Sequence, residues 1–262
     1  MKKNTPILID IDGVLRLGGK PAPGLHEFFD FLNKENLNAC LVSNTTLTTA
    51  EDQKKFFEEQ KIDLTIPILT ASDATYQYVK KNYNKAAVYC IDEVKKIFED
   101  VIDIENPEVV VIGDLMKGWN YEILTDIFRK VRAGADLVAI QKNRYWNTPQ
   151  DGYLLDVGPF VAAIEYATEK EATVIGKPSK IYFDTALQMI GSSIDKPFIM
   201  IGDDIETDIG AAQNYGGTGI LIYTGKTQYP LPKESKIKPD YEAMYLTGVR
   251  EVLCKILINF EE

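Results

Sequence analysis

The chain has 262 residues, of which 45% are hydrophobic and 26% charged, and it carries a net charge of -10. A chain of this length is too long for one ordinary hydrophobic core and suits two domains. The composition is that of an ordinary globular protein. An excess of acidic groups repels phosphate backbones and anionic lipid, so neither nucleic acid nor a membrane is an expected partner. A small anionic substrate would need a local cation or metal.

The cysteines and the single histidine narrow the chemistry. Cys40, Cys90 and Cys254 lie far apart, as is typical of a reduced cytosolic protein, and no apolar run could span a bilayer, so we expect a cytoplasmic location. His26 falls at an expected helix start and is expected at the surface, which leaves histidine nucleophiles and Ser-His-Asp triads poorly supported. No cysteine is followed six positions later by arginine, the spacing of a cysteine-dependent phosphatase loop. Carboxylates must therefore carry any catalysis.

In chain order, short apolar runs alternate with amphipathic stretches. The first run, residues 7–9, ends in Asp10 and Asp12 followed by Gly13, which is typical of a buried parallel strand entering a tight turn. Further strands are expected at residues 38–42, 66–69, 86–91, 108–112, 136–140, 172–175, 197–201 and 219–223. Helices are expected at residues 24–33, 72–81, 92–99, 121–131, 158–168, 181–190 and 249–260, with one more starting near Thr49. This alternation predicts parallel sheets with helices on both faces.

Polar residues follow four of the apolar runs. They are Asp10 and Asp12, Ser43, Lys177, and the acids Asp203, Asp204 and Asp208. In a doubly wound sheet the carboxyl ends of the strands meet at one crevice, so we expect these side chains to lie close together. Clustered carboxylates repel one another unless a cation intervenes, and an all-oxygen set suits Mg²⁺. A Mg²⁺ beside a lysine and a hydroxyl would receive a phosphoryl group.

These residues form four motifs that resemble the haloacid dehalogenase superfamily of aspartate-nucleophile phosphotransferases. The motifs follow the family's order, as Asp10-Ile11-Asp12-Gly13-Val14, Ser43-Asn44-Thr45, Gly176-Lys177-Pro178 and Gly202-Asp203-Asp204 through Asp208. The long insert between the second and third motifs resembles the α/β cap of the NagD-like, para-nitrophenylphosphatase-type subfamily. The resemblance implies an α/β fold with a Rossmann-like doubly wound parallel sheet core at residues 1–72 and 173–262. An inserted α/β cap domain would occupy residues 73–172.

The resemblance also implies roles for the acids of the first and last motifs. Asp10 would be the nucleophile that forms an aspartyl-phosphate. Asp12 would protonate the leaving oxygen and then take a proton from the attacking water. The side chains of Asp10 and Asp203, with the main-chain carbonyl of Asp12, would hold Mg²⁺. Dehalogenases of the superfamily lack the second acid of the first motif, so Asp12 favours phosphate chemistry.

The remaining motif residues would bind phosphate or support the metal. By the same resemblance, Ser43, the Asn44 amide and Lys177 would contact the phosphoryl group, and Asp208 would orient Lys177 or the waters of the metal. Ser43 could instead cap a turn, and Lys177 could be a solvated turn lysine. Two alternatives stay open for Asp204: a supporting position behind the metal or a position at the surface.

The cap loop at residues 142–146 departs from the Asn-Pro-Asp type loop that is common in the subfamily. Arg144 could clamp an anionic substrate, and Tyr145 or Trp146 could stack on a ring. The alternative is an exposed loop with a buried Trp. The departure leaves the identity of the substrate open. Subfamily members can dimerise through the cap, so the resemblance also allows a homodimer.

Together these features predict a Mg²⁺-dependent phosphatase, a phosphoric monoester hydrolase, that acts on a small phosphorylated metabolite. A phosphoamide or pyrophosphate hydrolase on the same scaffold is an alternative. A phospho-accepting receiver domain is a rival from another class, but its phosphorylated Asp follows a later strand and it has no inserted domain. A regulatory protein on an inactive hydrolase scaffold predicts the loss of a motif residue, and none is lost here.

Overall fold

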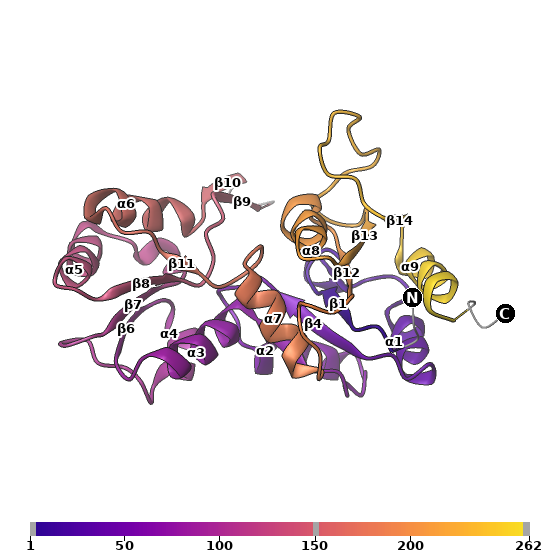
Figure 1. Ribbon diagram of the computed structural model, residues 1–262, viewed down its shortest axis with the longest axis horizontal. Helices are drawn as coiled ribbons and strands as arrows, with labels where there is room; N and C mark the ends of the chain where they lie inside the picture. The colour runs from indigo at the N-terminus through magenta and orange to yellow at the C-terminus, as the bar shows by residue number, and fades with distance from the viewer. Residues whose placement is uncertain (1–3, 149–151, 259–262) are drawn as a thin grey trace. The chain divides into compact units, whose positions relative to one another are not determined.

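The structure is a computed structural model, and it describes residues 4–148 and 152–258 (Figure 1). The chain divides into two compact units. Unit 1 comprises residues 1–43, 51–69 and 177–262, and unit 2 comprises residues 44–50 and 70–176. The assignment of unit 1 as the catalytic core and of unit 2 as the cap stays a prediction.

Unit 1 is built on a six-stranded sheet with the order β14-β13-β12-β1-β4-β5. The strands are β1 (Ile7–Asp10), β4 (Ala39–Ser43), β5 (Ile68–Thr70), β12 (Ile199–Gly202), β13 (Thr218–Ile222) and β14 (Tyr241–Ala243). The pairs from β14 through to β4 are parallel, and Leu8 of β1 lies between Cys40 of β4 and Met200 of β12. All residues of β1 are buried, as expected of a central strand covered on both faces.

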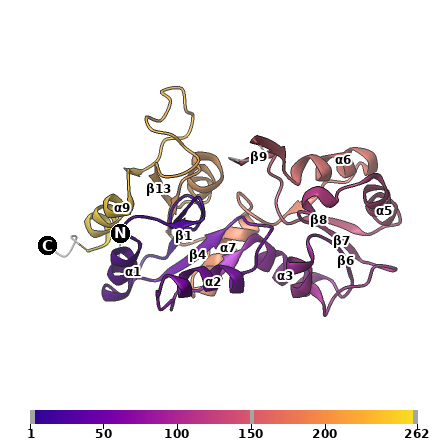
Figure 2. The ribbon, with the colours of Figure 1, turned by 180° about the vertical axis from the view of Figure 1, so that it is seen from behind.

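The helices of unit 1 cover this sheet. They are α1 (Leu25–Lys34), α2 (Ala50–Glu59), α7 (Lys180–Met189), α8 (Ala211–Asn214) and α9 (Leu246–Leu253). In both views α1 and α9 lie side by side, and the Arg250 guanidinium of α9 lies 5.6 Å from the ring centre of Phe31 in α1 (Figures 1 and 2). A π-helix at Ile205–Gly210 runs directly into α8, and a second at Cys254–Ile258 continues α9.

Residues 16–21 form a small antiparallel hairpin next to β1. β2 (Arg16–Leu17) pairs antiparallel with β3 (Lys20–Pro21), and Gly18 and Gly19 form the turn between them. Gly18 and Gly19 both have positive φ angles, which glycine adopts without the steric cost of a side chain. The sequence did not indicate the strands because each is only two residues long.

Unit 2 contains a four-stranded parallel sheet with the order β11-β8-β7-β6. The strands are β6 (Ala86–Tyr89), β7 (Val109–Ile112), β8 (Asp136–Ala139) and β11 (Thr173–Val174). The helices are α3 (Ala71–Asn82), α4 (Asp92–Lys95), α5 (Tyr121–Arg132) and α6 (Gly158–Thr168), with short 3-10 helices at Lys96–Phe98 and Met116–Gly118. Buried Val110, Ile127 and Val161 join β7, α5 and α6 in one apolar core.

The segment after β8 corrects one prediction. Residues 142–146 were expected to form a loop, but β9 (Tyr145–Thr148) pairs antiparallel with β10 (Gly152–Leu155). Aromatic and aliphatic side chains favour this pairing: Trp146 lies opposite Leu154, and the rings of Tyr145 and Tyr153 meet edge to face at 5.4 Å. The loop expectation holds only for residues 142–144.

The predicted fold class is confirmed by the parallel pairing within both sheets and the alternation of strands with helices. Most predicted elements are present, with ends that differ by a few residues. Besides the strands of the two hairpins, the elements that were not predicted are β14, the π-helix at Ile205–Gly210, α8 and the 3-10 helix at Met116–Gly118. Among the residues that the structure describes, no helix combines the length and the apolar character needed to cross a membrane.

Candidate active site

The sheet of unit 1 has a switch point between β1 and β12. The chain adds β4 and β5 on one side of β1 and then places β12, β13 and β14 on the other. Ligands of open α/β sheets bind outside the carboxyl ends of the strands at such a point. Asp10 ends β1 and Asp203 follows β12 directly, while Ile9 and Ile201 pair in parallel register. The fold therefore places both acids at the switch point.

Lys177 joins Asp10 to a third acid. Its Nζ lies 2.6 Å from Asp10 Oδ1 and 2.7 Å from Asp208 Oδ1. Lys177 precedes α7 and Asp208 belongs to the π-helix after β12, so the contact ties two distant segments to the end of β1. All three side chains are buried. Lys177 is therefore not a solvated turn lysine.

The absence of a side chain at Gly202 leaves the space that Asp208 occupies. A Cβ on Gly202 would overlap the Asp208 carboxylate, so only glycine fits at this position. The main-chain N–H of Asp204 donates to Asp208 Oδ2 at 3.2 Å, while Lys177 occupies Oδ1. Both Asp208 oxygens thus have protein partners, which is consistent with an acid that orients Lys177.

Asp204 caps the π-helix that carries Asp208. Its Oδ1 accepts from the main-chain N–H groups of Glu206 at 2.9 Å and Thr207 at 3.3 Å. Its Oδ2 pairs with the Lys226 ammonium. Burial alone would raise the pKa of Asp204, but Lys226 and the capping N–H groups outweigh burial and lower it. Asp204 is therefore an ionised, buried structural acid rather than a surface group.

Burial and mutual repulsion dominate the electrostatics of the other acids. Burial raises the pKa of Asp10, and Asp208 and Asp203 add to the rise, while Lys177 opposes it. Burial, with repulsion from Asp208, raises the pKa of Asp203 to about 7. Burial lowers the pKa of Lys177, but Asp10 and Asp208 outweigh it, so the pKa of Lys177 lies above its usual value. Lys177 therefore does not supply enough positive charge to balance the three acids when they are ionised.

The donor set fits a divalent cation. One carboxylate oxygen from each of Asp10, Asp203 and Asp208 lies within 4.8 Å of the others. Lys177 is the only buried basic side chain among the residues that the structure describes. When all three acids are ionised, the Lys177 ammonium leaves two of their negative charges uncompensated, and a divalent cation would balance these two charges. An all-oxygen donor set is the type that Mg²⁺ prefers.

Asp12 lies outside this buried cluster. Its side chain is 53% exposed and forms an ion pair with Arg16 at 2.8 Å. The Ser43 hydroxyl donates to Asp12 Oδ2 at 3.3 Å, so Ser43 and Asp12 are brought together as expected. The Arg16 guanidinium also lies over the Phe56 ring, 5.2 Å from its centre. Asp12 is thus accessible yet held in place, as a group that exchanges protons requires.

Tyr182 fixes the main chain at Ser43. Its buried hydroxyl accepts from the Ser43 main-chain N–H at 2.9 Å and lies 2.6 Å from the Leu69 carbonyl, to which it donates. The hydroxyl therefore links the ends of β4 and β5 through α7. Ser43 itself is buried at the end of β4. The next residue, Asn44, belongs to unit 2, where a Cβ on Gly176 would overlap Asn44 Oδ1.

Arg144 belongs to unit 2. It lies between β8 and β9 and is exposed, and Lys142, two residues before it, pairs with Glu165 of α6 at 2.5 Å. Trp146, for which burial was one alternative, is half-buried. The binding role suggested for Arg144 stays a prediction.

Three residues of the site were missed from the sequence. Arg16 stands four positions after Asp12, but i,i+4 pairs are common and carry little signal alone. Tyr182 sits on an ordinary helix face, and only the fold brings its hydroxyl to β4. Lys226 follows β13 in the stretch Thr224-Gly225-Lys226-Thr227, whose Gly and Thr residues read as an ordinary turn.

Comparison with known proteins identifies the family. The family model described as "Haloacid dehalogenase-like hydrolase" matches residues 7–102, and the model described as "HAD-hydrolase-like" matches residues 174–249. The haloacid dehalogenase-like hydrolase domain-containing protein 2 of Bos taurus is 36% identical over 242 residues, which cover 92% of this chain and 90% of that protein. The chain belongs to the haloacid dehalogenase-like hydrolases. The resemblance drawn from the four motifs is thereby confirmed.

Two further relatives of this haloacid dehalogenase-like hydrolase are phosphatases. The phospholysine phosphohistidine inorganic pyrophosphate phosphatase of Bos taurus is 32% identical over 241 residues, covering 89% of this chain and 88% of that protein. The crystal structure of 4-nitrophenylphosphatase from Thermotoga maritima superposes with a TM-score of 0.86 at 26% identity, covering 95% of this chain and 97% of that one. Within its family, the chain falls with the phosphatases, which are phosphoric monoester hydrolases.

Proposed function

We propose that this hydrolase is a Mg²⁺-dependent phosphatase that cleaves small phosphorylated metabolites through an aspartyl-phosphate on Asp10. The observation that carries the proposal is the buried contact of Asp10 with Lys177, beside Asp203 and at the switch point of the sheet. A carboxylate held at this place is positioned as a nucleophile, and the adjacent ammonium offsets negative charge on an incoming phosphoryl group.

In the first step, a carboxylate oxygen of Asp10 attacks phosphorus and the bond from phosphorus to the leaving oxygen breaks. Asp12 gives its proton to that oxygen. In the second step, Asp12 takes a proton from water, the water oxygen attacks phosphorus, and the bond to Asp10 breaks to release phosphate. The exposure of Asp12, two residues after Asp10, is consistent with this proton transfer.

The phosphoryl oxygens would be bound by Ser43, by the Asn44 amide and by Lys177. The hydroxyl of Ser43 already lies beside Asp12, and its main chain is fixed by Tyr182. Positioning and charge neutralisation supply most of the catalysis in phosphoryl transfer, so rigid support of these donors matters.

Asp10, Asp203 and the main-chain carbonyl of Asp12 would hold the cation, with Asp208 and Asp204 supporting them. When bound, Mg²⁺ supplies charge neutralisation at the phosphoryl oxygens and orients them. The two uncompensated negative charges of the buried cluster support a divalent ion at this place.

The nature of the leaving group is a separate question. The relative with 32% identity is named for phospholysine, phosphohistidine and inorganic pyrophosphate, so a phosphoamide or pyrophosphate hydrolase is the second candidate. Unit 2 would act as the cap, in which Arg144 would contact the substrate, and a homodimer through the cap and a cytoplasmic location complete the proposal. A phospho-accepting regulatory protein is less well supported, because all the residues needed for hydrolysis are present.

The direct test is hydrolysis of para-nitrophenyl phosphate by the purified chain with Mg²⁺ and with excess EDTA. Asp10→Asn should abolish activity, as should EDTA. Asp114→Asn is the matched control, because Asp114 follows Gly113 as Asp203 follows Gly202 and is also buried, yet lies after β7 in unit 2. Activity that survives in Asp10→Asn or in EDTA would rule out the proposal.

A further inference from the structure

The short segment after β13 contacts both loops that carry the metal-binding acids. We call residues 224–227, Thr-Gly-Lys-Thr, the clamp loop. It follows β13, the neighbour of β12 in the sheet, so its position at the carboxyl ends of the strands is set by the fold. None of the four sequence motifs includes it.

On one side the clamp loop holds the loop that follows Asp10. The Thr224 hydroxyl donates to the Gly13 carbonyl at 2.5 Å. Gly13 has a φ of 90°, a conformation that favours glycine, and its main-chain N–H donates to the Arg16 carbonyl at 2.8 Å. The contact with Thr224 therefore fixes the turn that directly follows Asp12.

On the other side the clamp loop holds Asp203 and the start of the π-helix. The main-chain N–H of Lys226 donates to Asp203 Oδ2 at 2.5 Å, and that of Thr227 donates to the Asp203 carbonyl at 3.0 Å. The Thr227 hydroxyl accepts from the Ile205 N–H at 3.0 Å. One short segment thus forms hydrogen bonds with both the side chain and the main chain of Asp203.

Two glycines confine the Asp203 carboxylate. A Cβ on Gly13 or on Gly225 would overlap it, and a Cβ on Gly225 would also lie 2.8 Å from the Gly13 Cα. The clamp loop therefore passes between the two acid-bearing loops at a separation that admits no side chain. Because both glycines face the same carboxylate, a change at Gly225 must displace Asp203, the Asp10–Gly13 turn, or both.

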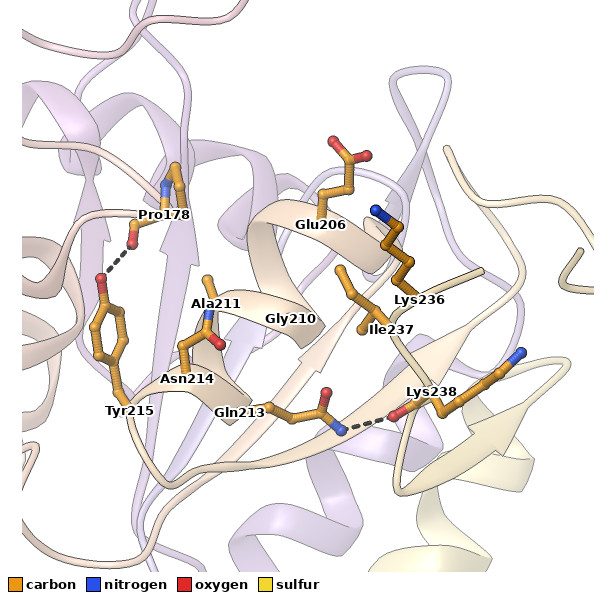
Figure 3. A pocket seen from close by; sticks show the side chains of 10 residues that line it. All are labelled: Pro178, Glu206, Gly210, Ala211, Gln213, Asn214, Tyr215, Lys236, Ile237 and Lys238. Carbon is orange, nitrogen blue, oxygen red and sulfur yellow. Dashed lines mark hydrogen bonds between the residues drawn. The ribbon is translucent and has the colours of Figure 1, made fainter. Parts of the chain in front are cut away.

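The chain beyond the clamp loop returns to the same π-helix. Ile237 packs on Gly210, where a Cβ would lie 2.5 Å from the Ile237 Cδ1 (Figure 3). Gln213 of α8 donates to the Lys238 carbonyl at 2.8 Å, and these residues line one pocket of about 390 Å³ (Figure 3). The segment after β13 thereby supports the π-helix at both ends, at Ile205 through Thr227 and at Gly210 through Ile237.

We propose that the clamp loop sets the position of Asp203 relative to the Asp10–Gly13 turn for binding of the divalent cation, with Thr224 and Gly225 as positioning residues. The inference rests on the proposed function, because it concerns the same cation. Neither residue would contact the cation by its side chain. Their effect comes from the placement of Asp203 and of the Asp12 main chain, so it should appear in cation binding without substrate.

The test is isothermal titration of Mg²⁺ into the metal-free protein without substrate. Thr224→Val removes the hydroxyl while keeping the shape, and should weaken Mg²⁺ binding about 5- to 10-fold, the loss expected of one hydrogen bond. Thr224→Ser keeps the hydroxyl and should stay within about twofold of wild type. Gly225→Ala forces a shift of Asp203 and should weaken binding more than Thr224→Val does. Because Gly225→Ala can also impair folding, Thr224→Val carries the test.

Thr185→Val is the matched control. The Thr185 hydroxyl donates to the Ile181 carbonyl at 2.7 Å within α7 and is not part of the clamp loop, so this variant should bind Mg²⁺ as wild type does. A steady-state titration at saturating substrate should show the same ranking in the Mg²⁺ concentration needed for half-maximal rate, with the rate largely restored at high Mg²⁺. Wild-type binding in Thr224→Val would overturn the clamp while leaving the proposed function intact. Failure of the wild-type protein to bind Mg²⁺ would overturn both.

Discussion

Lys177 Nζ lies 2.6 Å from Asp10 Oδ1, and both side chains are buried. Lys177→Met would remove the buried ammonium that contacts Asp10 and Asp208. Loss of one partner from a buried pair costs about 3–5 kcal/mol, so the metal-free variant should be destabilised by about that amount in urea titrations. Phosphatase activity should fall about 100-fold or more, because a charge next to the reacting phosphoryl group is lost. Lys180→Met, an exposed lysine three residues later, is the control and should change neither quantity appreciably.

Asp203 provides a prediction that separates metal binding from folding. In the metal-free protein, Asp203→Asn removes a buried charge that Asp208 repels, so the variant should be at least as stable as wild type in EDTA. Addition of Mg²⁺ should raise the melting temperature of wild type, because a ligand that binds only the folded state stabilises it, but should hardly affect Asp203→Asn. Equal Mg²⁺ stabilisation of both proteins in a thermal melt would exclude Asp203 as a ligand.

The pH dependence of stability in EDTA follows from the same acid. The pKa of Asp203 is about 7 in the folded protein, against an ordinary value of 3.8. Between these values the folded protein holds a proton that the unfolded chain releases, so its contribution to stability is lost as pH rises, by at most about 1.4 kcal/mol per pH unit. Asp10 and Asp208, whose pKa values are also raised, act in the same direction. Urea titrations across this range should therefore show a steeper loss in wild type than in Asp203→Asn, and parallel curves would contradict the assignment.

The Tyr182 hydroxyl should stabilise the folded protein at the end of β4. Tyr182→Phe leaves the buried Ser43 N–H and Leu69 carbonyl without this hydroxyl, a loss expected to cost about 1–3 kcal/mol. Tyr215→Phe removes a hydroxyl that donates to the Pro178 carbonyl at 3.0 Å in a more exposed place, and should cost less than about 0.5 kcal/mol. Chemical denaturation of both variants checks the difference. Equal losses would mean that the hydroxyl of Tyr182 does not support Ser43.

The central part of the site could be predicted from the sequence. The apolar run before Asp10 and the Gly-Asp-Asp pattern at residues 202–204 both mark strand ends, and strand ends of one parallel sheet must meet. Lys177 follows the apolar run at residues 172–175 and could be placed with these acids on the same ground, while the family's motif order added its role. The burial of these groups could not be predicted, because it depends on how α7 and the π-helix close over the strand ends.

The missed features depend on contacts between segments that are distant in the chain. Nothing in the local pattern connects Tyr182 with Ser43 or Thr224 with Gly13, since both contacts arise from the order of the strands. The hairpin of β9 and β10 was missed for a different reason. The polar residues 141–144 precede it and made the whole segment look like a loop, although the aromatic residues at 145 and 146 favour a strand.

Trapping of the phosphorylated enzyme tests the central claim most directly. Para-nitrophenolate leaves without needing a proton, so Asp12→Ala should still be phosphorylated by para-nitrophenyl phosphate but should hydrolyse the aspartyl-phosphate slowly. After acid quenching, peptide mass spectrometry should locate one phosphoryl group on Asp10 in the presence of Mg²⁺. That group should be absent in EDTA and from the Asp10→Asn and Asp12→Ala double variant. A phosphoryl group on another residue, or turnover with no phosphoryl group on Asp10, would contradict the account.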